Sequence, residues 1–223
     1  MKRTSVLIIC VICFICGCTQ DAYDKGEGKY SLLRADFVEA HANGQKNIDY
    51  VTTDDGDRLS IGEPFTAKWI TRADSTYRCV FYYNRVEDSA EAVSVRQVPC
   101  PKPTPLSELG KEMKTDPVNF ESAWISKTGR YLNLRLLLMT GTTDDEEASQ
   151  TLAVIRDTIM TNADHTRTCY LRLYHDQAGV PEYYSTQVYA SIPMKDIDAD
   201  SVRIRINTYQ GVKEYKFKSR KYE

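Results

Sequence analysis

The sequence predicts an all-β protein with an N-terminal barrel of the OB type and a C-terminal antiparallel β-sandwich. Short segments in which apolar and polar residues alternate predict the strands, and turn residues separate these segments. A proline-rich segment near the middle of the chain predicts a joint between the two parts. The chain has 223 residues, which is enough for one or two domains with cores of their own.

A secretion signal is predicted at residues 1–17. Two basic residues precede an apolar segment at residues 6–16. This segment is shorter than the roughly 20 residues that a membrane-spanning helix needs, and its length is typical of a signal peptide. It leads into the sequence Ile-Cys-Gly-Cys at residues 15–18, which resembles the bacterial lipobox. We therefore expect cleavage before Cys18 and attachment of a lipid to its thiol.

The predicted partner of this N-terminus is a membrane, which a diacylglycerol anchor on Cys18 would hold. The polar residues 18–29 include two glycines and are expected to form a flexible tether. Thr19 follows the cysteine where an aspartate would favour the inner membrane, so the outer membrane is expected. Some Gram-negative lipoproteins use an acidic patch after the cysteine for export to the cell surface. The acidic residues of this tether are sparse, so the sequence does not decide between the periplasmic face and the cell surface.

Residues 30–100 predict the barrel. The acidic sequence Asp54-Asp55-Gly56-Asp57 is a strong hairpin turn between the second and third strands. About five strands in this length suit an OB-type barrel, and an SH3-like barrel would give a similar pattern. The segments expected to be strands are residues 30–42, 48–53, 58–61, 76–86 and 92–98, and residues 65–70 suit either a strand or an irregular connection.

Residues 101–117 are expected to form a linker, because the alternating prolines at positions 99, 101, 103 and 105 cannot lie inside a sheet. Residues 106–114 suit one or two helical turns. Residues 118–223 then predict the sandwich, with tight-turn signals at residues 127–129 and 210–211. Its expected strands are residues 121–126, 131–140, 152–160, 168–175, 183–192, 202–209 and 212–218, of which 152–160 would also suit a helix.

Three cysteines remain after the leader and the anchor. Cys79 and Cys100 flank a predicted hairpin, so an oxidising compartment would allow a disulfide between them, although the strict geometry of this bond leaves its formation undecided. Cys169 alternates with two leucines and is expected to face a core. The chain has no CxxC motif and three histidines, which is a poor basis for a zinc site.

The search for catalytic chemistry is negative. The chain contains no nucleophile elbow, phosphate loop, HExxH motif or dinucleotide fingerprint. His175 and Asp176 are adjacent, and we expect them in a loop that closes a hairpin. The formal net charge of −2 is unsuited to a nucleic-acid binder. We therefore expect no enzyme, no cofactor, no metal and no nucleic-acid partner.

Tyrosine and arginine alternate with the predicted core residues of the sandwich. If the leucines, isoleucines and valines point inward, these residues point outward. Tyrosine and arginine are enriched at binding hot spots, although cross-strand pairs that stabilise a solvated sheet, or one sheet packing on the barrel, would give the same pattern. The candidate ligand-binding residues are Tyr131, Arg135, Tyr170, Arg172, Tyr174, Arg203, Arg205 and Tyr209.

The segment Leu171-Arg172-Leu173-Tyr174-His175-Asp176-Gln177, followed by a glycine turn and Glu182-Tyr183-Tyr184-Ser185, resembles the NigD-like lipoprotein family of Gram-negative anaerobes. The resemblance implies an N-terminal OB domain and a C-terminal β-sandwich. It also implies a suggested role in immunity of a producer cell to its bacteriocin. It supplies no catalytic residues.

Two functions follow as expectations. The first is a non-enzymatic envelope lipoprotein that binds a protein or glycan ligand through the tyrosine and arginine face. The second is an architectural subunit of an outer-membrane or surface assembly.

Overall fold

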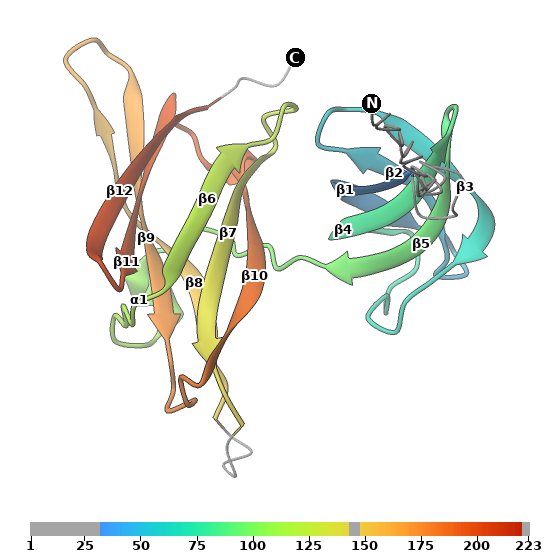
Figure 1. The fold of residues 1–223 in the computed structure, drawn as a ribbon. Helices are drawn as coiled ribbons and strands as arrows, with labels where there is room; N and C mark the ends of the chain where they lie inside the picture. The colour runs from blue at the N-terminus through green and yellow to red at the C-terminus, as the bar shows by residue number, and fades with distance from the viewer. Residues whose placement is uncertain (1–31, 143–147, 220–223) are drawn as a thin grey trace, which may run out of the picture. The chain divides into compact units, whose positions relative to one another are not determined.

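The structure is a computed structural model that describes residues 32–142 and 148–219 (Figure 1). Its first five strands close into a barrel in the order β1-β2-β3-β5-β4, with β1 antiparallel to β4 and β3 parallel to β5. The predicted OB-type barrel is therefore confirmed. The strands are β1 (Leu33–Ala42), β2 (Ile48–Thr53), β3 (Arg58–Phe65), β4 (Ser75–Val86) and β5 (Ser89–Gln97).

The predicted turn between β2 and β3 forms as expected. Gly56 has a φ of 97°, a conformation that residues with a side chain rarely adopt. The backbone of Thr53 donates to the Asp57 carbonyl at 2.8 Å, which closes the hairpin. The third strand continues to Phe65 instead of ending at residue 61, and no strand covers residues 66–70.

The barrel core comes from alternate residues of its strands. Cys79, Phe81 and Tyr83 of β4 are buried, as the alternation predicted. The Phe81 and Tyr83 rings stack at 5.3 Å between centroids, and Tyr83 Oη donates to Asp36 Oδ2 at 2.8 Å. Burial, followed by this hydrogen bond, raises the pKa of Tyr83 to about 12. The phenol therefore stays a neutral donor at physiological pH.

The remaining strands form two sheets. One has the order β10-β7-β6 and the other the order β12-β11-β9-β8. Neighbouring strands are antiparallel except β9 and β11, which pair in parallel. The predicted sandwich is confirmed, and its third strand is a strand and not a helix. The strands are β6 (Asn119–Ile125), β7 (Tyr131–Thr140), β8 (Thr151–Thr161), β9 (Arg167–Asp176), β10 (Tyr184–Pro193), β11 (Ser201–Thr208) and β12 (Gly211–Lys218).

The sandwich core lies between these two sheets. Alternate residues of β7 face it from one side, and alternate residues of β9 and β11 face it from the other. Each fully buried leucine or isoleucine contributes about 1.5–3 kcal/mol relative to an exposed one. The largest of these buried side chains are Leu132, Leu134, Leu136, Leu171, Ile192 and Ile204.

The linker runs beside the four-stranded sheet and contains one helical turn, α1 (Leu106–Leu109), between Pro105 and Gly110. Thr104 hydrogen-bonds with the edge strand β8, donating to the Val154 carbonyl at 3.1 Å. Farther along, Thr115 forms a parallel bridge with His175 of β9. The linker is thus attached to the sandwich at two points.

His175 was expected in a hairpin loop, and this expectation is wrong. The residue lies within β9 and is 1% exposed. Its Nδ1 is 3.0 Å from the Asp116 carbonyl oxygen, and its Nε2 is 3.3 Å from Gln150 Oε1. The ring therefore connects β9 to the linker and to the segment before β8.

The disulfide between Cys79 and Cys100 that the sequence allowed is absent, because both residues are free thiols. The antiparallel pairing of β4 with β5 places Cys79 opposite Gln97, three positions before Cys100. Cys79 and Cys169 are buried, whereas Cys100 is exposed. Desolvation raises the pKa of Cys79 to about 12, so this thiol is protonated at neutral pH.

Candidate functional site

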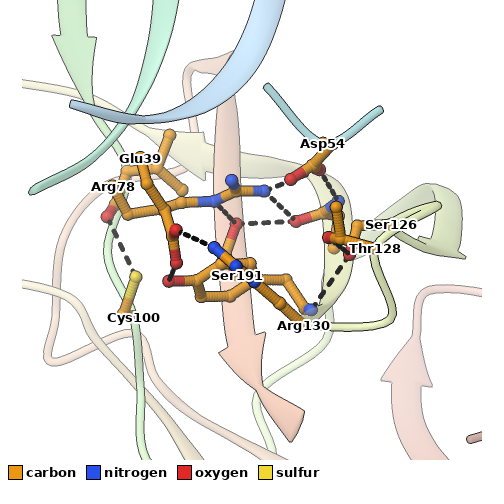
Figure 2. Close-up of polar contacts among 11 residues, drawn as sticks. Glu39, Asp54, Arg78, Cys100, Ser126, Thr128, Arg130 and Ser191 are labelled. Carbon is orange, nitrogen blue, oxygen red and sulfur yellow. Dashed lines mark hydrogen bonds and ion pairs between the residues drawn. The ribbon is translucent and has the colours of Figure 1, made fainter. Parts of the chain in front are cut away.

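An almost completely buried arginine, Arg78 of β4, joins the barrel to the sandwich (Figure 2). Only 3% of its side chain is exposed. Its Nη2 donates to Asp54 Oδ2 at 2.7 Å and to Asn133 Oδ1 at 3.1 Å, and its Nε donates to Ser191 Oγ at 3.1 Å. Asp54 belongs to the β2–β3 turn, whereas Asn133 and Ser191 belong to β7 and β10. We call these four residues the Arg78 cluster.

The other members of the Arg78 cluster also bind one another. Asn133 Nδ2 donates to Asp54 Oδ2 at 2.9 Å, and Ser191 Oγ donates to Asn133 Oδ1 at 2.7 Å. Burial of a charge is costly unless the charge is paired and hydrogen-bonded. The cluster meets this need, although Arg78 Nη1 has no hydrogen-bond partner within residues 32–142 and 148–219.

Aromatic rings cover the Arg78 cluster. The guanidinium carbon of Arg78 lies 4.0 Å from the ring centroid of Tyr131 and 5.3 Å from that of Phe37. The Phe37 ring meets Trp124 and Tyr189 edge-on, at 5.5 and 5.1 Å between centroids. Trp124 and Tyr189 come from β6 and β10, so the outer face of the three-stranded sheet packs on the barrel.

Glu39 of β1 makes a further polar contact between the two parts. It accepts a hydrogen bond from Tyr131 Oη at 2.8 Å and forms an ion pair with Arg130. Burial and then the hydrogen bond to Glu39 raise the pKa of Tyr131 well above its usual range. Tyr131 therefore acts as a neutral donor that fixes the Glu39 carboxylate.

A cavity of about 520 Å³ lies beside these contacts. Its lining includes residues of β1, β4 and β7, the segment after β5, and the segment around the end of β10. Three of the lining side chains are cationic and one is anionic. The residues are Glu39, Thr76, Arg78, Cys100, Arg130, Tyr131, Pro193 and Lys195.

Four of the predicted ligand-binding residues lie together on the outer face of the four-stranded sheet. The parallel register of β9 and β11 places Tyr170 beside Arg203 and Arg172 beside Arg205. The guanidinium carbon of Arg203 is 5.9 Å from the centroid of the Tyr170 ring. We call these four residues the outer Tyr/Arg face.

Carboxylates on the two flanking strands pair with the arginines of this face. Asp157 of β8 binds Arg172 through contacts of 2.6–2.8 Å. Glu214 of β12 accepts from Arg203 at 2.8 Å and from Arg205 at 3.0 Å, and these two hydrogen bonds lower its pKa. Acidic side chains on the two outer strands thus flank the arginines of the two inner strands.

The other predicted residues do not join this face. Tyr131 and Arg135 lie on β7 in the other sheet, where Tyr131 contacts the barrel and Arg135 pairs with Glu121 at 2.5 Å. Tyr209 is 41% exposed and donates to Glu182 at 2.9 Å, beyond the end of β11. The eight residues therefore do not form one surface.

The expectation that Tyr174 points into solvent is wrong, since it is 0% exposed. Buried and partly exposed residues alternate along β9 as far as Arg172, but the three residues 173–175 are all buried. The linker passes this end of β9, where Thr115 bridges to His175. A distant segment thus covers a position that the strand pattern leaves open.

Cys18 and the leader and tether at residues 1–29 lie outside the described residues. Within the described part of the chain, no helix is long and apolar enough to cross a membrane. That part also contains no group of three or more histidine, cysteine or acidic side chains arranged to hold a metal ion.

Sequence reasoning missed the Arg78 cluster. Asp54 was assigned only to a turn, and Arg78 occupies one of the outward positions of an alternating strand. Asn133 and Ser191 are small polar residues at such positions, where solvent exposure is the usual outcome. The only hint of the cluster in the sequence was the alternative explanation of the tyrosine and arginine pattern, in which one sheet of the sandwich packs on the barrel.

Comparisons with known proteins agree with this architecture. A family model for the NigD-like C-terminal β-sandwich domain matches residues 102–219, which is just over half of the chain. No curated protein gives a significant match.

Several solved structures share the fold across both parts. A NigD-like immunity protein from Bacteroides caccae has 21% sequence identity and a TM-score of 0.66, over 84% of this chain and 97% of that chain. A protein of unknown function from Bacteroides vulgatus has 16% sequence identity and a TM-score of 0.66, over 85% of this chain and 92% of that chain. A Bacteroides fragilis protein described as a candidate lipoprotein has 13% sequence identity and a TM-score of 0.64, over 86% of this chain and 99% of that chain. Sequence identities this low show the fold alone. The family model covers more than half of the sequence, and the chain therefore belongs to the NigD-like family.

Proposed function

We propose that this protein is a lipid-anchored, non-enzymatic protein of the bacterial envelope that binds a protein partner through its outer Tyr/Arg face. The observation that carries the proposal is the register of β9 and β11, which places Tyr170, Arg172, Arg203 and Arg205 side by side. The outer face of the other sheet packs on the barrel through Trp124 and is therefore not free for a partner.

The chemistry of the outer Tyr/Arg face favours a protein over a glycan. Tyrosine and arginine concentrate binding energy at protein interfaces, because they combine a large contact area with hydrogen-bonding tips. Arg172 and Arg205 lie side by side between Asp157 and Glu214, and this charge pattern is one that a complementary protein surface can match. In the immunity version of the proposal, the partner is a bacteriocin, which fits the description of the Bacteroides caccae structure as an immunity protein.

The anchor is tested by replacing Cys18 with alanine. We expect the native protein to carry a diacylglycerol group on Cys18 and to partition into detergent, since lipid chains contribute about 0.8 kcal/mol per buried CH₂. The C18A protein should lack the acyl mass and remain in the aqueous phase. Intact-mass spectrometry and detergent phase separation measure both results. An unmodified Cys18 in the native protein would contradict the proposal.

The outer Tyr/Arg face is tested with the triple variant Tyr170→Ala, Arg172→Ala and Arg205→Ala in the full chain. Partners cross-linked in cells and identified by mass spectrometry should fall at least tenfold in yield, since hot-spot residues contribute about 2 kcal/mol or more each. Arg85→Ala, which removes a partly exposed arginine of the barrel, is the control and should leave the yield unchanged.

Three outcomes would contradict the proposed surface. They are an unchanged yield with the triple variant, an equal loss with Arg85→Ala, and competition by free glycans instead of by the protein partner. Circular dichroism of the triple variant confirms that its fold is intact.

A further inference from the structure

We propose that the cavity beside Glu39, Arg130 and Lys195 binds a small monocarboxylate ligand. Its volume of about 520 Å³ lies in the range of roughly 300–1,000 Å³ that is typical of small-molecule sites. The cavity is separate from the outer Tyr/Arg face, because none of the residues of that face lines it. The proposal therefore stands independently of the proposed function.

The charges around the cavity favour an anion. Asp54 pairs with Arg78, and Glu39 pairs with Arg130. Lys195 is exposed and makes no hydrogen bond or ion pair with any described residue. The five charged groups together therefore leave one positive charge, which matches a singly charged carboxylate better than a doubly charged phosphate.

The hydrogen-bonding groups point to the same ligand chemistry. Both carboxylate oxygens of Glu39 have a partner, namely Tyr131 for Oε1 and Arg130 for Oε2. The groups of lining residues that have no partner among the described residues include the Lys195 ammonium, the Thr76 hydroxyl and Arg78 Nη1. Arg130 also has N–H groups that Glu39 does not use. The free hydrogen-bonding groups of the cavity are thus mainly donors, which suits a ligand that accepts hydrogen bonds.

The same cavity offers a surface for the apolar body of such a ligand. The Tyr131 ring is held in place by Arg78 at 4.0 Å and by the hydrogen bond to Glu39, and Pro193 and Cys100 complete the less polar side. Figure 2 shows Cys100 and Asp54 at opposite ends of Arg78. These contacts form before any ligand arrives, and a preformed site loses less entropy on binding.

The test uses the full chain, isotopically labelled, with benzoate as the probe and benzamide as its neutral counterpart. We expect benzoate to shift the amide resonances of Thr76, Cys100 and Lys195 with a Kd of about 1 mM. Benzamide should bind at least tenfold more weakly, because it lacks the charge that Lys195 recognises.

Variants locate the site. Lys195→Met keeps the side-chain length, removes the charge, and should weaken benzoate binding about tenfold, as expected for a hydrogen bond to a charged group. Lys195→Arg should restore binding to within about threefold, because it keeps the charge. Lys213→Met on β12 removes a lysine far from the cavity in the sheet order and should leave the Kd unchanged.

The proposal is overturned by any of four results: no benzoate-dependent shift, equal binding of benzamide, an unchanged Kd in Lys195→Met, or tighter binding of inorganic phosphate than of benzoate. The triple variant of the outer Tyr/Arg face should bind benzoate normally. Failure of one proposal is therefore distinguishable from failure of the other.

Discussion

Replacing Arg78 with alanine should lower the free energy of unfolding by about 3–5 kcal/mol, the usual cost of removing one partner of a buried ion pair. The variant leaves Asp54 without its cation and deprives Asn133 and Ser191 of a donor. Urea denaturation followed by tryptophan fluorescence measures the loss, and Trp124 at the junction serves as a reporter.

The Arg78 substitution should also separate the unfolding of the two parts. The barrel and the sandwich have separate core clusters, and the Arg78 cluster connects them. We therefore expect two transitions in place of a single one, which a second probe such as circular dichroism would resolve.

The matched control for Arg78 is Arg85→Ala on the same strand. Arg85 pairs with Asp57, but 29% and 48% of the two side chains are exposed. Exposed ion pairs contribute about 0–1 kcal/mol, so this variant should lose little stability. Similar small losses in both variants would show that the Arg78 cluster does not hold the two parts together.

Replacing Tyr174 with alanine should cost about 3–5 kcal/mol, as expected for deleting a buried aromatic side chain. Tyr174 is fully buried at the end of β9. If the residue pointed into solvent, as the strand pattern predicted, the cost would be about 0.5 kcal/mol or less. Chemical denaturation of the purified protein distinguishes the two positions of this side chain.

Tyr183→Ala is the comparison for Tyr174, because the Tyr183 side chain belongs to a residue that is 75% exposed. Its expected loss is about 0.5 kcal/mol. Equal losses in the two variants would mean that the linker does not cover the end of β9. Proteolysis within residues 101–117 should be faster in Tyr174→Ala, since the linker would lose the surface on which it packs.

Local patterns predicted most of the fold. The alternation in β4 identified Cys79, Phe81 and Tyr83 as core residues, and the β2–β3 turn formed where Gly56 allows a positive φ. Alternation in β7 identified its buried leucines. Such patterns suffice because a strand's two faces and a tight turn depend on neighbouring residues.

The candidate sites were only partly predictable. The outer Tyr/Arg face was found in the sequence, but Tyr131 and Arg135 were wrongly grouped with it, since the sequence does not say which sheet a strand joins. The parallel pairing of β9 and β11 decided that grouping. The tight β4–β5 turn, with Val86 paired to Ser89, likewise decided that Cys79 lies opposite Gln97 and not opposite Cys100.

The sequence by itself determined most strands and turns and the inward side of each strand, and the lipobox at Cys18 stays a prediction. Only the tertiary structure decided which outward sides are covered. Arg78 meets Asp54 across 24 positions of sequence and Ser191 across 113, so no local pattern marks these residues as partners. The physical reason is that the burial of an outward side chain depends on which distant segment packs against it, and that segment is selected by the packing of the whole fold.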